Sequence, residues 1–193
     1  MEETKMTFPL IGEPLAVDLA NTLLEREEGS EDLLATPERL LAWCEAEGER
    51  LGVLNAAGLG GRLPEFLVLR GAIRELFRGL LDGERPSEGA VEEINTASAR
   101  VPRFRELRWE TEDQQGGLRA QTRDVGGEEA DIALASIARS AIELAGDPGR
   151  EFLRSCPAPG CPLIFCAENS RKRWCSNACG NRVRVARHYR HHH

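Results

Sequence analysis

Apolar residues recur at the three- and four-residue spacing of a helix over much of the first 145 positions. The clearest run is residues 65–81, where Phe66, Leu69, Ile73 and Leu76 lie on one face. Thr36-Pro37 supplies an N-cap hydroxyl and a first-turn proline for another helix. Helices are predicted over residues 15–26, 36–47, 65–81, 87–97 and 129–145.

One stretch departs from this spacing. Residues 104–111 alternate with period two, so that Arg105, Leu107 and Trp109 share one side of a strand. Residues 118–122 can pair with them across a turn that contains Gly116-Gly117. The predicted fold class is therefore mainly α with a small β-hairpin near residues 104–122 (α+β).

The sequence Gly146-Asp147-Pro148-Gly149 is the strongest break in the chain. It predicts a boundary between a mainly helical domain, residues 1–148, and a small second domain, residues 151–193. A length of 193 residues with 41% hydrophobic residues suits one cored domain plus a small unit, or a single larger fold.

No apolar run approaches the roughly 20 residues needed to span a bilayer. The N-terminus is polar and acidic, unlike a signal peptide. These features predict a cytoplasmic protein without a membrane partner, and a reducing compartment favours metal-binding cysteines over disulfides.

Charge divides the chain in the same place. Residues 151–193 contain eight Arg or Lys against Glu151 and Glu168, which gives a formal charge of +6. Since the whole chain has a net charge of −7, residues 1–150 carry a formal charge of −13. An acidic body with a basic tail indicates two units with different partners.

Four cysteines in two short pairs predict one structural zinc ion held by Cys156, Cys161, Cys175 and Cys179. A knuckle rich in proline and glycine separates the first pair. Ser176 is a natural N-cap for a helix that carries the second pair. With strands at residues 163–165 and 173–174, the unit would be a treble-clef-like zinc module.

Cys166 competes for the first pair, because it follows Cys161 at the same spacing that separates Cys156 from Cys161. The Pro-x-Pro-Gly turn favours Cys156 as the ligand. Cys166 is then expected to continue the strand after Phe165 as a partly buried thiol.

The chain has no Asp or Glu from residue 171 to its end. Acid-free basic segments suit phosphate contacts, because each neutralised phosphate releases counterions. The alternatives are a solvated basic tail, or a face that docks on an acidic protein surface of the same or a neighbouring chain. The predicted nucleic-acid-binding residues are Arg171, Lys172, Arg173, Arg182, Arg184, Arg187 and Arg190.

Two motifs resemble known families. Residues 173–176 with Cys179-Gly180-Asn181-Arg182 resemble the CGNR zinc finger, which is named after that tetrapeptide. Residues 15–22 are similar to the leucine–aspartate…asparagine–threonine motif of the ABATE domain, to which such fingers are commonly joined. The resemblance covers nearly the whole chain. It implies the same four zinc ligands, a DNA-binding basic helix and a role in stress-induced transcription regulation.

Asp18, Asn21 and Thr22 have the spacing of one helix face. They are candidates for a ligand pocket in a sensor domain. The structural alternatives are a buried hydrogen-bonded cluster that fixes the N-terminal segment, or a solvated face.

The functional prediction is a zinc-dependent DNA-binding transcription regulator whose body senses a small-molecule effector or mediates homodimerisation. One alternative is an RNA-binding module, in which Trp174 would stack on a base. Another is an interaction protein whose zinc module docks on an acidic partner. The histidines lie only at the far C-terminus and no triad, phosphate loop or paired-carboxylate motif occurs, so an enzyme is not expected.

Overall fold

A computed structural model describes residues 8–9, 12–53, 55–110, 117–146, 148–167, 169 and 171–192, without the side chains of residues 56, 57, 110, 188 and 190–192. Its helices are α1 (Leu15–Ala20), α2 (Pro37–Glu47), α3 (Leu63–Asp82), α4 (Glu88–Ala99), α5 (Glu129–Ala145) and α6 (Asn177–His192). The strands are β1 (Leu23–Arg26), β2 (Gly29–Asp32), β3 (Arg103–Glu110), β4 (Gly117–Asp124), β5 (Leu153–Ser155) and β6 (Ile164–Cys166). Short 3-10 turns at Gly48–Leu51, Ala56–Arg62 and Gly149–Phe152 connect them.

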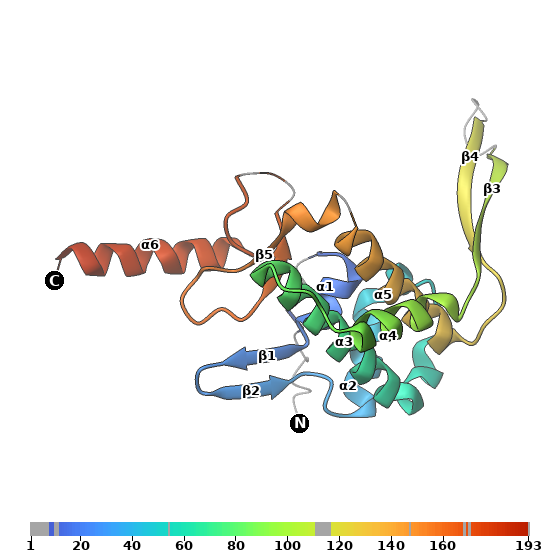
Figure 1. Cartoon of the computed structure of the whole chain (residues 1–193), viewed down its shortest axis with the longest axis horizontal. Helices are drawn as coiled ribbons and strands as arrows, with labels where there is room; N and C mark the ends of the chain where they lie inside the picture. Colours follow the sequence, from blue (N-terminus) through green and yellow to red (C-terminus); the bar gives the residue numbers. More distant parts are fainter. Residues whose placement is uncertain are drawn as a thin grey trace, which may run out of the picture.

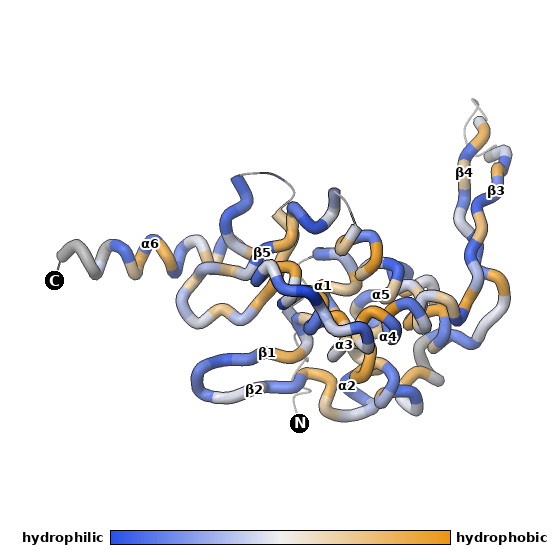
Figure 2. Tube along the Cα trace, viewed as in Figure 1, coloured by the Kyte–Doolittle hydropathy of each residue, from blue (hydrophilic) through white to orange (hydrophobic). Residues whose placement is uncertain are grey.

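The helical body forms around α3 and α5, which pack with α1 and α4 (Figure 1). Its largest fully buried side chains include Trp43, Phe66 and Phe77. Figure 2 shows apolar positions gathered on the helices of this body, whereas the outer part of the β1–β2 hairpin is hydrophilic. The mainly α fold class with a small hairpin is confirmed.

Local signals set most helix ends as predicted. The Thr36 hydroxyl accepts a hydrogen bond from the Arg39 amide at 3.4 Å, and Ser87 does the same for Ala90 at 3.1 Å. Helix α3 ends at Gly83, whose φ of 73° lies in the left-handed region that glycine adopts without strain.

The prediction of one helix over residues 15–26 is wrong beyond Ala20. All six residues of α1 are buried, and the chain then turns into the antiparallel β1–β2 hairpin. The Arg74 guanidinium of α3 donates to the carbonyls of Ala20 and Leu23, both at 2.8 Å, and Thr22 donates to Leu19 at 2.6 Å. These contacts supply hydrogen-bond partners for carbonyl groups at and just after the end of α1. The helix can therefore end there without leaving buried carbonyl groups unpaired.

The second hairpin lies where the alternating pattern predicts it. Strands β3 and β4 pair antiparallel from Arg103 opposite Asp124 to Glu110 opposite Gly117. This hairpin stands away from the body, on the side far from α6 (Figure 1). No helix in the described part of the chain is both long enough and apolar enough to cross a membrane.

Candidate metal centre and basic surface

Four thiols converge beside the start of α6. The sulfur atoms of Cys156, Cys161, Cys175 and Cys179 all lie within 4.8 Å of one another. Sγ of Cys175 is 3.7 Å from that of Cys161 and 3.5 Å from that of Cys179. A tetrahedron with Zn–S bonds of about 2.3 Å has edges of about 3.8 Å. The donor set and its dimensions thus fit one structural zinc ion with four thiolate ligands.

The knuckle of this site lies at the closed end of a hairpin. Strands β5 and β6 flank it, and the Cys156 amide extends their ladder by donating to the Leu163 carbonyl at 2.9 Å. Gly160 turns the knuckle with a φ of 67°. The first ligand pair is therefore fixed by backbone pairing on both sides.

The predicted strand at residues 173–174 is wrong, because β6 pairs with β5 instead. Residues 173–174 are coil, and the Trp174 ring packs over the start of α6. A Cβ atom placed on Gly180 would lie 3.3 Å from that ring. Side-chain packing on the zinc unit's own small core thus replaces strand pairing at this position.

Helix α6 begins as predicted at Ser176, whose hydroxyl accepts from the Cys179 amide at 3.3 Å. Cys175 precedes this cap, so only Cys179 lies on the helix itself. The second ligand pair therefore joins the end of the loop to the first turn of the helix.

Burial raises the pKa of the Cys161 thiol to about 11. That thiol is protonated at neutral pH when no metal is bound, and zinc must displace its proton to bind. Zinc affinity is consequently expected to fall as the pH falls.

Cys166 lies outside the four-thiol cluster. It ends β6, is 9% exposed, and belongs with Leu153 to the core of the body. Burial raises the pKa of its thiol to about 12. Cys166 continues the strand as expected, but its thiol is buried and not partly buried.

The body holds the outer edge of β6 through two polar side chains. The Asn21 amide accepts from the Ile164 N–H at 3.0 Å and donates to the Ile164 carbonyl at 2.9 Å. Glu13 accepts from the Cys166 N–H and pairs with Lys172 at 2.6 Å. Residues 164 and 166 face the same edge, because the residue between them faces β5. Sequence reasoning missed Glu13 altogether, since a lone acid before a helix carries no signal of its distant partner.

The candidate pocket residues Asp18, Asn21 and Thr22 are all buried. Their partners lie in three different segments: Asp18 accepts from Arg50 at 2.9 Å, Asn21 holds β6, and Thr22 accepts from Arg70 at 3.2 Å. The solvated-face alternative is wrong, and the hydrogen-bonded cluster describes their contacts. A ligand role for them stays a prediction.

The predicted basic residues do not share one environment. Lys172 is drawn toward the body by Glu13 and lies 5.6 Å from the Phe165 ring centre. Arg182 donates to the Pro159 carbonyl of the knuckle at 2.9 Å, and Arg184 donates to Asn181. Arg187 is exposed, whereas the side chain of Arg190 lies outside the described residues.

A basic hollow of about 400 Å³ lies at the start of α6. Arg171, Arg173 and Arg184 line it together with Trp174 and with residues at the start of α6, among them Ser176, Asn177 and Gly180. Helix N-termini favour anions, because their free N–H groups and the helix dipole point outward. The hollow thus combines guanidinium groups with a helix N-terminus.

Comparison with protein families adds to this geometry. Residues 13–148, more than half of the chain, match the model of the ABATE family, which is described as "Putative stress-induced transcription regulator". The chain belongs to the ABATE family. Residues 153–192 of this ABATE protein match the CGNR zinc finger. No curated protein matches the chain. Both matched families are of regulator or zinc-finger type, and neither is an enzyme family.

The tetrapeptide of the CGNR finger has a structural role at each position. Cys179 supplies one of the four clustered thiols, and Gly180 gives room to Trp174. Asn181 binds the Arg184 side chain, while Arg182 ties the helix to the knuckle. In this ABATE protein the tetrapeptide therefore assembles the zinc unit as well as contributing charge.

Proposed function

We propose that this ABATE protein is a DNA-binding transcription regulator whose zinc unit presents α6 to duplex DNA, while the body senses a ligand or mediates dimerisation. The observation that supports DNA binding is the placement of α6, which extends away from the body (Figure 1). Arg182, Arg184 and Arg187 are exposed along it. A basic helix docked on its own acidic body would have removed this support.

The size and charge of α6 suit a duplex. Its 16 residues make a rod about 24 Å long, and the major groove of B-DNA, roughly 12 Å wide, admits a helix. The formal charges of +6 for residues 151–193 and −13 for residues 1–150 direct the zinc unit toward phosphates and the body away from them.

Duplex contact is favoured over base stacking by the state of Trp174. Its ring packs against Gly180 on one side and lies 5.7 Å from the Arg173 guanidinium. A half-buried ring with these neighbours offers little free face to an unstacked base. Single-stranded RNA is therefore ranked below duplex DNA as a partner. An acidic protein surface is the other alternative partner.

Salt-dependent binding tests the proposal. The zinc-loaded chain is titrated with duplex DNA over a range of salt concentrations, and Arg184→Gln/Arg187→Gln is compared with wild type. The plot of log affinity against log salt has a negative slope, and each lost phosphate contact reduces its magnitude by about 1. The slope of the double variant is therefore expected to be smaller in magnitude by about 2.

The matched control is Arg78→Gln/Arg85→Gln, which removes the same charge from exposed side chains of the body. It is expected to bind like wild type, and zinc content should be unchanged in both variants. Equal binding by the two double variants would refute the role of α6. Tighter binding to single-stranded RNA, weakened most by Trp174→Ala, would favour the RNA alternative.

A further inference from the structure

One face of the β3–β4 hairpin is apolar and uncovered. Leu107 is 69% exposed, and Trp109 and Leu118 are each 63% exposed. Trp109 lies opposite Leu118 in the register, and Leu107 lies opposite the exposed Ala120, so all four share one face. Figure 2 shows a few apolar positions among hydrophilic ones along both strands. We refer to these four residues as the arm patch.

The opposite face of the hairpin carries mainly charged and polar side chains, with Phe104 near its root. Glu106 forms ion pairs with Arg108 at 3.0 Å and with Arg123 at 3.5 Å. An isolated two-stranded hairpin is marginally stable in water and gains most from cover on an apolar face. The arm patch is therefore the side on which a partner would stabilise the hairpin.

The root of the hairpin is tied to the body. Arg103 binds Asp124 through two hydrogen bonds of 2.7 and 2.8 Å across the first strand pair. Arg139 of α5 adds a contact to Asp124 at 3.2 Å and donates to the Val101 carbonyl just before β3. These contacts fix where both strands leave the body.

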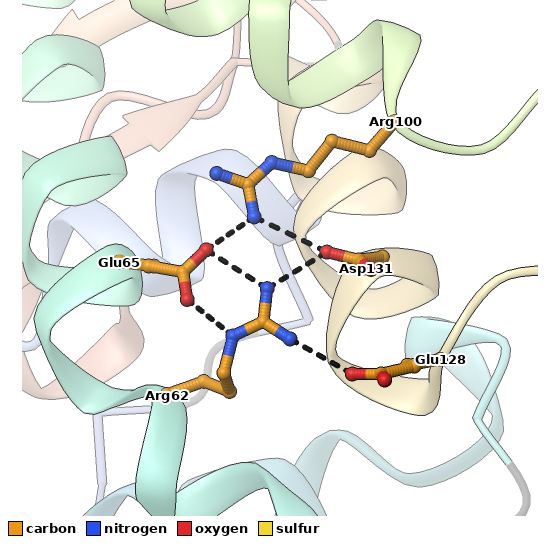
Figure 3. A network of polar contacts seen from close by, with 5 residues as sticks. All are labelled: Arg62, Glu65, Arg100, Glu128 and Asp131. Carbon is orange, nitrogen blue, oxygen red and sulfur yellow. Dashed lines mark hydrogen bonds and ion pairs between the residues drawn. The ribbon is translucent and has the colours of Figure 1, made fainter.

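A second network clamps the segments that lead into and out of the hairpin (Figure 3). Arg100, at the end of α4, and Arg62, before α3, both bind Glu65 and Asp131. Arg62 also reaches Glu128 at 3.1 Å, four residues after β4. With both connections held, the hairpin presents the arm patch in a defined direction.

We propose that the arm patch is the interface through which two copies of this chain associate, packed face to face and antiparallel about a two-fold axis near Leu107. The centre of the patch carries no charge, so two copies can bury it without leaving an ion unpaired. Arg105 lies on the same face toward the root, and Trp109 lies toward the outer end. Antiparallel packing sets Arg105 over Trp109 of the partner subunit, a favourable cation–π pair, whereas parallel packing would set like charges together.

The area of the patch limits how much surface two copies can bury. The exposed parts of its side chains amount to roughly 400 Å², within the range of functional apolar patches. Two such patches bury on the order of 800 Å², below the roughly 1,200–2,000 Å² of stable complexes. The dimer is therefore weak and concentration-dependent. The inference rests on the dimerisation part of the proposed function, and its test uses no DNA, so a failure of DNA binding leaves it untouched.

Sedimentation velocity of the full, zinc-loaded chain over about a hundredfold range of concentration in the micromolar regime tests the inference. Wild type is expected to shift from monomer to dimer, while Leu107→Lys and Leu107→Glu each stay monomeric. An equimolar mixture of these two variants is expected to dimerise again, because Leu107 meets its counterpart at the two-fold axis.

Phe104→Lys is the control, because Phe104 lies on the opposite face and is 46% exposed. It should dimerise like wild type, and helical content and zinc content should match in all variants. Wild type that remains monomeric throughout, or Leu107→Lys that dimerises like wild type, would overturn the inference. A mixture that stays monomeric while wild type dimerises would overturn the packing about Leu107.

Discussion

Two buried carboxyl groups share one guanidinium near the start of the chain. Arg50 donates to Asp18 at 2.9 Å and to Glu47 at 2.5 Å, and both acidic side chains are fully buried. Among the described residues, one oxygen of each carboxyl finds no hydrogen-bond partner. Burial raises the pKa of Asp18 to about 6 and that of Glu47 to about 7. The folded state therefore holds protons here that the unfolded chain releases.

This site makes the free energy of unfolding depend on pH. Because the folded pKa values lie above the unfolded values of about 4, stability is greatest below pH 4 for these groups and is lost as the pH rises toward 7. Glu47→Gln removes one of the two groups, so its stability relative to wild type is expected to rise by on the order of 2 kcal/mol between pH 4 and pH 8. Urea unfolding at several pH values measures the difference.

The control for this prediction is Glu45→Gln on the exposed side of the same helix. Its stability relative to wild type is expected to stay constant with pH. Parallel pH profiles for Glu47→Gln and wild type would show that the buried pair does not hold the extra proton.

At the scale of elements, β6 joins the two units. One edge pairs with β5 of the zinc unit, and the other is held by Asn21 and Glu13 of the body. An uncovered strand edge presents free N–H and C=O groups, and here side chains take the place of a third strand. The asparagine of the ABATE motif thus acts across the boundary between the units.

Loss of the hydrogen bonds between Asn21 and the Ile164 backbone should lower the free energy of unfolding by a measurable amount. Asn21→Ala leaves the N–H and C=O of Ile164 without their partner, which costs roughly 1–3 kcal/mol of unfolding free energy for a buried group. Denaturant unfolding of the full chain gives the value. Asn95→Ala, an exposed asparagine on α4, is expected to change stability by less than about 0.5 kcal/mol. Similar values for the two variants would exclude a docking role for Asn21.

At the scale of the whole molecule, the body separates two projections, with α6 on one side and the β3–β4 hairpin on the other (Figure 1). The zinc unit has a small core of its own, built on ligand cysteines with Ala158, Phe165 and Ala167. The body has a much larger core that also includes Leu153 and Cys166. Metal binding is therefore expected to stabilise mainly the knuckle and α6.

Removal of zinc tests this division. A chelator is expected to abolish hydrogen-exchange protection of α6, while α3 and α5 keep theirs and added zinc restores the pattern. Because zinc must displace thiol protons, the same loss should appear at lower chelator concentration as the pH falls. Simultaneous loss of protection in α3 would mean that the two cores unfold as one.

Local patterns sufficed wherever the deciding interaction was short in range. The cap at Thr36, the extents of α3 and α5 and the alternation of β3 lie close to their predicted positions. The cysteine spacing likewise identified the four thiols that converge. Residues 21–26 and 173–174 were predicted wrongly, because distant groups decide them: Arg74 satisfies the end of α1, and β5 takes the edge of β6.

The sequence by itself determined the helical body, the β3–β4 hairpin, the four cysteines that cluster and the charge difference between the two ends, because periodicity, capping and ligand chemistry act within a few residues. Only the tertiary structure decided which residues of these parts contact one another and which stay exposed. In the folded chain Lys172 forms an ion pair with Glu13, and Asn21 hydrogen-bonds to the backbone of Ile164. Arg187 and the arm patch remain exposed. The reason is physical: burial and pairing depend on which surfaces meet, and residues more than a hundred positions apart carry no local sign of their contact.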